Sequence, residues 1–364
     1  MNKEENDIHE NRKWEHVQLI LEKNVQSTKN WMDDIKIIPS AIPLIDISEI
    51  DISCDIFNWK FDAPFYIAAM TGGHRKVKAI NQILAEVCAE ANIPLGLGSQ
   101  RVALRDEQLV DTFKVARDAA SDVFLVGNLG MAQLVQAKDP VREANKCVSM
   151  IEADALAIHF NKLQELVQVE GDRKFSRVLK ILDKVIAELD IPVIVKEVGM
   201  GFSRRDYEHL SKFNLGAIDV GGLGGTNFSL VEAARAATAE YPYSRNMGET
   251  FKDCGTPTPI SIEHAKQTTD IPIIATGGIR TGLDVVKALC IGATMAGTAY
   301  PFLVSSTGDM QDGQKTGLNE TRKEVATFIM EIKIAMTLLN ATTVTELNEG
   351  DIHYSADLDR MRAH

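Results

Sequence analysis

Short apolar runs rich in β-branched residues recur eight times along this chain, each followed by a glycine or polar loop and then by a helical pattern. Neighbouring runs mostly start 23 to 37 residues apart, which is the size of one strand–helix unit. Near-continuous apolar strands that alternate with amphipathic helices are typical of a parallel sheet covered on its outer face. The eight predicted strands are residues 64–69, 94–97, 123–126, 155–158, 192–195, 217–220, 271–275 and 294–297.

Eight such units that close on themselves form a (β/α)8 TIM barrel, whereas a doubly wound open sheet is the alternative fold. The open sheet is disfavoured because it carries its glycine-rich fingerprint in the first strand–helix turn, and here such loops come late in the chain. We expect one barrel domain over residues 64–340, an N-terminal arm over 1–63 and a C-terminal tail over 341–364. Further predictions are helices over 12–24, 77–91, 175–189 and 228–240, an irregular stretch over 241–259, and a closing helix over 319–340.

Composition and charge narrow the class of protein. The 364 residues are 45% hydrophobic and 25% charged, which is ordinary for a globular chain with a large core. The net charge of −12 argues against a protein that coats nucleic acid or binds a membrane surface, but it leaves room for a local anion site. The five cysteines are scattered without metal or redox spacing, the N-terminus is too polar for a signal peptide, and no apolar run approaches a membrane span. We therefore expect a cytoplasmic protein with reduced thiols.

Unusual polar residues collect where the predicted strands end, and this is the edge at which barrel enzymes carry their active sites. Each residue alone has a simpler interpretation. Thr71 or Ser99 could cap the following helix, Asn128 could satisfy a turn, and His159 alone is more often a packing histidine. The coincidence of all eight strand ends gives the pattern its weight. These ends carry 70–73, 98–101, Asn128, His159 to Glu165, Lys196-Glu197, 221–227, 277–280 and Thr298-Ala299.

The glycine loops after the last three strands indicate a phosphate site. Loops at this position in barrels offer backbone N–H groups and a helix N-terminus to an anion, and glycine lets the backbone approach closely. One phosphate needs one such loop. Three loops together with Lys196 predict a larger ligand, such as a mononucleotide cofactor.

The sequence gives weaker evidence for a metal site and for residues that would bind an anionic substrate. No His-x-x-x-His motif or cysteine cluster points to zinc, whereas Glu165 suits Mg²⁺, which proteins often hold through one or two carboxylates plus phosphate and water. From the residues alone, a solvated helix residue is the favoured interpretation of Glu165. Arg12 and Lys13 fall in the first turn of the predicted helix, where cations oppose the macrodipole. They are either solvated there or bring in an anion.

Taken together, these motifs resemble the type 2, flavin-dependent isopentenyl-diphosphate isomerases. The matching motifs run in the same order over nearly the whole chain. They are Arg12-Lys13-x-x-His16, Ala69-Met70-Thr71-Gly72-Gly73, Gly98-Ser99-Gln100-Arg101, Asn128-Leu129-Gly130, His159-Phe160-Asn161-x-x-Gln164-Glu165, Glu170-Gly171-Asp172, Val195-Lys196-Glu197-Val198-Gly199, Asp219-x-Gly221-Gly222-x-Gly224-Gly225-Thr226-Asn227 and Gly277-Gly278-Ile279-Arg280.

The resemblance implies an FMN-binding barrel and assigns roles to individual residues. His159 and Gln164 would act in catalysis, and Glu165 would carry Mg²⁺. The diphosphate and isoprenoid site would be formed by Arg12, Lys13, Arg101, Asn161 and Gln164, with Arg12 and Lys13 reaching it from a neighbouring part of the assembly. FMN would be bound by Met70, Thr71, Gly72, Ser99, Asn128, Lys196, Thr226, Gly277, Gly278, Ile279, Thr298 and Ala299.

The implied reaction interconverts isopentenyl and dimethylallyl diphosphate by a 1,3-proton shift, with reduced FMN as acid/base and NADPH as the reductant. The family also forms homo-tetramers or homo-octamers. Two departures from the family pattern are Phe160 in place of leucine and Cys254 in place of tryptophan. If the family tryptophan packs over the substrate, the second departure makes this pocket roomier or differently sealed.

The alternative function is an FMN-dependent oxidoreductase of the 2-hydroxy-acid oxidase type. It would share the phosphate loop, but it would need a histidine and paired arginines after the sixth and seventh strands. A third, non-enzymatic alternative is a barrel that binds a phosphorylated ligand for regulation. The sequence offers no output segment for it.

Overall fold

The computed structural model describes residues 3–238, 242–307 and 314–362, and for residues 3–12, 238, 242, 314 and 315 it describes the backbone alone. Eight parallel strands form a closed barrel in the order β10-β11-β4-β5-β6-β7-β8-β9, so the last strand pairs with the first and no edge is left. The (β/α)8 fold and all eight predicted strands are confirmed. Their bounds are β4 Phe65–Ile67, β5 Leu95–Gly96, β6 Leu125–Gly130, β7 Ala155–Phe160, β8 Val193–Glu197, β9 Ala217–Asp219, β10 Ile273–Ala275 and β11 Met295–Thr298.

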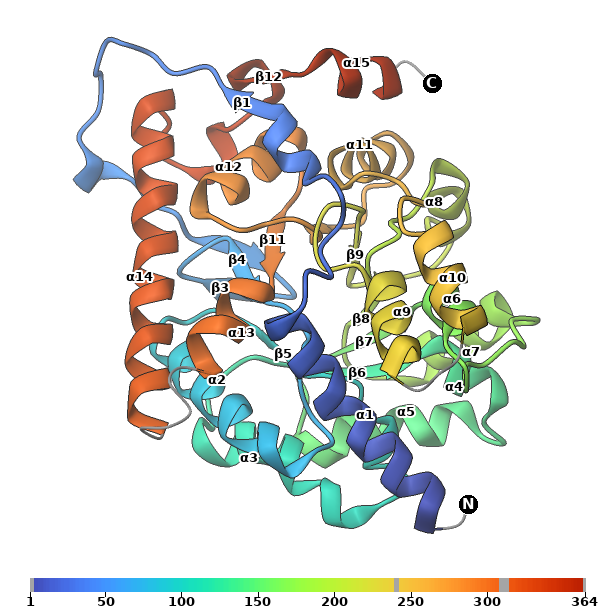
Figure 1. Ribbon diagram of the computed structural model, residues 1–364. Coiled ribbons are helices and arrows are strands. Elements are labelled where there is room, and N and C mark those ends of the chain that lie inside the picture. Colours follow the sequence, from blue (N-terminus) through green and yellow to red (C-terminus); the bar gives the residue numbers. More distant parts are fainter. Residues whose placement is uncertain (1–2, 239–241, 308–313, 363–364) are drawn as a thin grey trace.

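Helices surround the barrel (Figure 1). Those that follow the strands on the outside are α2 Lys78–Glu90, α3 Asp111–Ala119, α5 Pro140–Ile151, α7 Val178–Glu188, α8 Arg204–Leu210, α11 Thr258–Thr268, α12 Gly282–Ile291 and α14 Gln314–Leu339. Further helices lie in the loops: α4 Met131–Gln136, α6 Lys162–Val167, α9 Phe228–Thr238, α10 Pro242–Thr250 and α13 Tyr300–Thr307. Within the described ranges, every helix is too short or too polar to span a bilayer.

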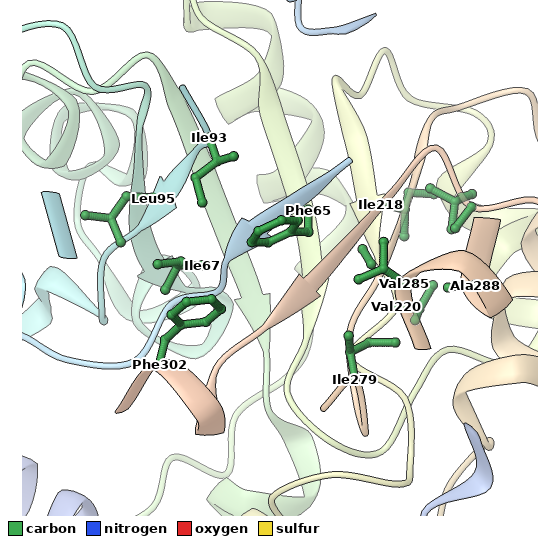
Figure 2. Packing of buried hydrophobic residues seen from close by; sticks show 14 of the residues in the cluster. Phe65, Ile67, Ile93, Leu95, Ile218, Val220, Ile279, Val285, Ala288 and Phe302 are labelled. Carbon is green, nitrogen blue, oxygen red and sulfur yellow. The ribbon is translucent and has the colours of Figure 1, made fainter. Parts of the chain in front are cut away.

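Residues along each barrel strand alternate between two separate cores. On β4, Phe65 and Ile67 face outward to the helices, whereas Tyr66 between them faces the barrel interior. Figure 2 shows outward residues of β4 and β9 packed against α12 and α13. The interior is filled mainly by small or branched side chains, among them Ala155, Ala157, Val126, Ile194, Ala217, Ile274 and Met295. The barrel is therefore a packed core, and a ligand can enter only at its ends.

A β-hairpin closes the N-terminal end of the barrel. Strands β2 (Cys54–Ile56) and β3 (Trp59–Phe61) pair around Phe57 and Asn58, whose φ angles of 60° and 58° make the tight turn. Its aromatic rings surround Phe124, which lies just before β6, at centroid distances of 5.3 to 5.6 Å. With this end plugged, the polar strand ends on the opposite side are the open face.

The arm and the tail meet beside the barrel. Strand β1 (Ile35–Ile37) pairs with β12 (Ile352–Tyr354), and helix α15 (Ala356–Arg362) follows and packs on α11 (Figure 1). The described helix α1 spans Lys3–Glu22 and packs on α9. The prediction that Arg12 and Lys13 lie in the first turn of a helix is therefore wrong, because the polar residues before them continue the helix. The irregular stretch predicted over 241–259 is also wrong in part, since it contains α10 and the start of α11.

The closing helix α14 covers the seam between β4 and β11 through an aromatic cluster. The ring of Phe328 lies 5.4 Å from that of Phe65 and 5.3 Å from that of Phe302, and all three are fully buried. Replacing Phe328 by alanine should cost about 3–5 kcal/mol. For a chain of this length that corresponds to a drop in Tm of roughly 4–6 °C in a thermal unfolding scan.

The matched control is Met330→Ala, two residues away on the exposed side of the same helix. It should shift Tm by less than ~1 °C. Equal shifts for the two variants would contradict the assignment of Phe328 to the core.

Candidate active site

A cavity of about 220 Å³ opens at the C-terminal ends of the barrel strands. One water needs on the order of 10–15 Å³ by this measure, so the space is that of a ligand. Gly72 does not line it, and Arg12 lies in α1 with its side chain outside the described part. The other predicted site residues all line it: Lys13, Met70, Thr71, Ser99, Arg101, Asn128, His159, Asn161, Gln164, Glu165, Lys196, Thr226, Gly277, Gly278, Ile279, Thr298 and Ala299.

The glycine loops form a backbone cradle at one part of the cavity. Gly277 and Gly278 have φ angles of 104° and 89°, which favour glycine, and a Cβ on Gly277 would lie 2.1 Å from the carbonyl oxygen of Gly222. Among the described residues, no protein acceptor takes the N–H groups of Gly277, Gly278 or Ile279. Successive free N–H groups in this conformation make a nest that suits an anion such as phosphate.

Arg280 supplies a cation beside this nest, and the sequence analysis did not assign it a role. Its guanidinium donates to the Gln26 side chain and lies 5.0 Å from the ring centroid of Tyr300. Burial lowers the pKa of Arg280, and within the described ranges no carboxylate pairs with it. A half-buried guanidinium whose direct contacts, Gln26 and Tyr300, are neutral favours an anionic ligand. The available signal was its place directly after the Gly-Gly-Ile loop.

Lys196 is held at the cavity wall by a carboxylate inside the barrel. Its ammonium donates to Asp219 Oδ2 over 2.8 Å and to Thr276 Oγ1 over 3.4 Å. Asp219 is fully buried and also accepts from the hydroxyls of Tyr66 and Thr276 and from the N–H of Gly221. Burial, with the Asp219 charge, raises the pKa of Tyr66 well above its usual value, so the phenol stays a donor.

His159 lies beside Asn128 at the ends of β7 and β6, because both strands run further than the apolar runs predicted. Its Nδ1 donates to Asn128 Oδ1 over 2.7 Å, an assignment that leaves Nε2 without a proton. Burial lowers the pKa of His159 to about 3, and the charges of Lys13, Lys196 and Arg101 act in the same direction. The imidazole is therefore neutral at physiological pH.

Helix α6 begins with an amide and carboxylate cluster. Asn161 Nδ2 donates to Gln164 Oε1 over 3.1 Å and to Glu165 Oε1 over 3.0 Å, and the N–H of Asp172 donates to Glu165 Oε2 over 2.7 Å. Gln164 Nε2 in turn donates to Glu232 Oε1 over 2.9 Å. This cluster fixes which oxygens and amides face the cavity.

Glu232 and His16 extend this cluster, and the sequence analysis gave neither a role. Burial alone would raise the pKa of Glu232, but His16, whose Nε2 lies 3.1 Å from Glu232 Oε1, and Gln164 lower it to about 2. His16 was visible in the motif Arg12-Lys13-x-x-His16, whereas Glu232 lay within a predicted amphipathic helix and gave no signal of its own.

Two further cations reach the cavity. Arg101 Nη1 lies 3.3 Å from Asp172 Oδ2, and Lys13 enters from helix α1. Among the described residues, Glu165 is the one carboxylate that lines the cavity, and no three His, Cys, Asp or Glu side chains group to hold an ion. This leaves room for the type of Mg²⁺ site in which phosphate and water complete the coordination.

Glu197 shapes the loop after β8. Its Oε2 accepts the N–H groups of Val198, Gly199, Met200 and Gly201 at 2.5 to 3.0 Å. Burial raises the pKa of Glu197 to about 7, although these N–H groups oppose the shift. Val198 and Gly199 line the cavity, so Glu197 acts on the site through the loop rather than from its wall.

The profile of the FMN-dependent dehydrogenase family matches residues 110–354. This chain therefore belongs to the class of (β/α)8 barrels of the FMN-dependent dehydrogenase family. Two solved structures have the same fold. The flavin-binding domain of baker's yeast flavocytochrome b2 superposes with a TM-score of 0.63 at 17% identity, covering 89% of this chain and 77% of that one. A mutant chimera of (S)-mandelate dehydrogenase gives 0.63 at 12% identity, covering 96% and 99%.

Sequence relatives define the family more narrowly. The isopentenyl-diphosphate delta-isomerase of Thermococcus onnurineus is 42% identical over 345 residues, which cover 93% of this chain and 89% of the relative. That of Archaeoglobus fulgidus is 40% identical over 347 residues, covering 95% and 96%. This chain belongs to the type 2 isopentenyl-diphosphate delta-isomerase family, as its motifs predicted.

The low pKa of His159 predicts how it responds to acid. The native imidazole should stay neutral at pH 5, whereas in the unfolded chain it would bind a proton near pH ~6.5. The free energy of unfolding should therefore be highest above about pH 6.5 as far as His159 is concerned. Below that pH it should fall by ~1.4 kcal/mol for each pH unit until the pH reaches about 3, because only the unfolded chain binds the proton. Histidine-selective ¹⁵N NMR, with the resonance assigned through His159→Gln and the exposed His353 as comparison, checks the neutral state. A midpoint near pH 6.5 would contradict it.

Proposed function

We propose that this enzyme interconverts isopentenyl diphosphate and dimethylallyl diphosphate by a 1,3-proton shift, with FMN bound at the strand ends. The observation that carries the proposal is that one cavity holds two sets of anion-binding groups. The first is the cradle of Gly277, Gly278 and Ile279 with Arg280, and the second is Lys13 and Arg101 beside the carboxylate Glu165. A single phosphorylated ligand would need only one of them.

The first set suits the FMN phosphate. The N–H groups of Gly277 to Ile279 have no acceptor among the described residues, and the cradle exists because its glycines carry no Cβ. Thr298 Oγ1 holds the loop by donating to the carbonyl of Ile279 over 2.9 Å, and Ala299 precedes the N-terminus of α13. The remaining predicted contacts, Met70, Thr71, Ser99, Asn128, Lys196 and Thr226, line the rest of the same cavity and would face the ring system. Gly72 does not line the cavity, so its backbone would contribute only by shaping the loop. A Cβ at this position would collide with the ring of Phe113.

The second set would bind the substrate. Lys13, Arg101 and, from the same helix, Arg12 would neutralise the diphosphate, and Glu165 would hold a Mg²⁺ ion that bridges to it. Asn161 bonds to both Gln164 and Glu165, so it would keep the amide and the carboxylate at a fixed spacing. The cations also explain how a chain with a net charge of −12 binds two anions.

Protonation of an unactivated alkene needs an acid and base that ordinary side chains at this rim do not provide. Reduced FMN, formed with NADPH, would supply that acid/base chemistry. The neutral His159 is a poor proton donor at physiological pH, so its part is to orient the ligands through Nε2 while Asn128 holds Nδ1. Gln164, held by Asn161 and Glu232, would orient the alkene end in the same way.

The 2-hydroxy-acid oxidase alternative is not favoured by the site. The loop after β9 reads Gly221-Gly222-Leu223-Gly224-Gly225-Thr226-Asn227 and provides neither a histidine nor an arginine, and Arg280 is the one arginine directly after β10. The likeness to flavocytochrome b2 and mandelate dehydrogenase therefore concerns the fold. A cytoplasmic homo-tetramer or homo-octamer completes the proposal.

An assay of the purified enzyme tests the reaction. With FMN, Mg²⁺ and catalytic NADPH, we expect isopentenyl diphosphate to be converted to dimethylallyl diphosphate with no stoichiometric use of NADPH, because the proton shift has no net redox change. Product analysis and absorbance at the NADPH band measure the two quantities. Consumption of one NADPH per product would reject the isomerase, and lack of FMN binding would reject both flavoenzyme functions.

Glu165→Gln separates the metal from the flavin. The variant removes the charge that would hold Mg²⁺ but keeps an acceptor for Asn161 or for the N–H of Asp172. We expect KM for isopentenyl diphosphate to rise tenfold or more at limiting Mg²⁺, as for a lost charge-assisted contact, with FMN affinity unchanged. Glu188→Gln, on the exposed surface of α7, is the matched control and should change neither. Loss of FMN in Glu165→Gln would instead reject its metal role.

A further inference from the structure

The N-terminal arm runs along the glycine loops of the site. We call residues 25–30 the strap. Its backbone forms a ladder with the loop after β9: Asn227 N–H donates to Val25 over 2.8 Å, and Ser27 N–H donates to Gly225 over 2.8 Å. Gln26 lies between them as the bridge partner of Thr226. The strap thus covers a cavity loop from outside the barrel.

The strap side chain Asn30 reaches the second loop. Its Nδ2 donates to the carbonyl of Gly278 over 2.9 Å, and its Oδ1 accepts from the N–H of Met32. A Cβ on Gly278 would lie 2.2 Å from Asn30 Oδ1, so the loop approaches this side chain as closely as glycine allows. The Gly278 carbonyl and the Ile279 N–H share one trans peptide plane and point in opposite directions, so anchoring the carbonyl away from the cavity also fixes the direction of the Ile279 N–H. Asn30 thereby helps to turn the N–H groups of the cradle toward the cavity.

Gln26 acts on the cation. Its Oε1 accepts from the Arg280 guanidinium, and the same side chain lies 3.4 Å from Thr226 Oγ1. A neutral carboxamide orients the guanidinium without cancelling its charge, whereas a carboxylate at this place would neutralise it. The position of Gln26 is therefore suited to a site that must keep a positive charge for an anion.

We propose that Gln26 and Asn30 are positioning residues for the FMN phosphate: the strap fastens the two glycine loops and aims Arg280 so that the phosphate-binding geometry is preformed. The inference rests on the proposed function, since it assumes that the anion in the cradle is the phosphate of FMN. Neither residue lines the cavity, so their effect passes through Gly278 and Arg280.

A comparison of two flavins tests the proposal on the full-length, flavin-stripped enzyme. Riboflavin has the same ring system as FMN but no phosphate, so phosphate positioning affects FMN alone. For Gln26→Ala and Asn30→Asp, flavin fluorescence titrations should show FMN affinity about tenfold or more weaker, the scale of one charged hydrogen bond, and riboflavin affinity within twofold of wild type. Gln26→Glu should weaken FMN at least as much, because it adds a carboxylate beside Arg280.

Thr28→Ala is the matched control on the same strap. Its exposed hydroxyl donates to Asp253 Oδ1 over 2.9 Å, away from both glycine loops, and its removal should leave both affinities unchanged. Unchanged FMN affinity in Gln26→Ala and Asn30→Asp, or an equal loss of FMN and riboflavin, overturns the inference. A wild-type enzyme that binds neither flavin would instead overturn the proposed function, and this outcome is read before any variant is made. Asn30→Asp keeps the acceptor for Met32, which limits its effect on folding, and Gln26→Glu keeps the size of its side chain.

Discussion

The buried carboxylate of Asp219 is the constraint on which the open face of the barrel depends. Transfer of a charge into the protein interior costs several kcal/mol unless partners surround it. Here the partners come from different strands, with Tyr66 from β4, Lys196 from β8 and Thr276 from the residue after β10. The hydrogen bonds of Asp219, itself on β9, therefore fix how the ends of β4, β8, β9 and β10 are positioned relative to one another. Lys196 is fixed as a result, and it is the one member of this network whose charge can serve the cavity it lines.

Much of the barrel could be predicted because its strands are local signals. A strand buried on both faces is a continuous apolar run, and the eight runs needed no knowledge of distant residues. The strand ends were harder. Asn128 and His159 belong to β6 and β7, yet they are polar because they face the cavity, so the apolar pattern stops before the ladder does. The helix over 242–250 was missed for a related reason, since its Pro, Tyr, Gly and Thr residues resemble a loop.

The site was predictable where the geometry of the fold places residues automatically. All eight strands point the same way, so whatever follows them meets at one rim, and that rule brought His159, Lys196 and Gly277 together. That rule does not predict which residues reach the rim from segments outside the strand ends. Gln26 contacts Arg280 and Asn30 contacts Gly278 across some 250 positions of sequence, and no local pattern marks such a pair. Glu232 likewise meets Gln164, whose side chain lines the cavity, only in the folded chain and across 68 positions of sequence.

The arm joins the two anion-binding ends of the cavity within one short segment. Lys13 and His16 on α1 line the part of the cavity where we propose that the substrate binds, and the strap that follows contacts the cradle and its cation through Asn30 and Gln26. Only Lys23 and Asn24 separate the end of α1 from the strap, and the N–H groups of Lys23 and Val25 bond to the carbonyls of Leu19 and Lys23, so a shift of the strap would be passed on to the helix. An anion that tightens the cradle therefore also favours the position of Lys13, and by linkage the reverse holds with the same free energy. With FMN as that anion, the flavin would order the very side chains that recognise the substrate diphosphate. Each ligand would then strengthen the binding of the other by the same free energy, whichever binds first, without any contact between the two ligands.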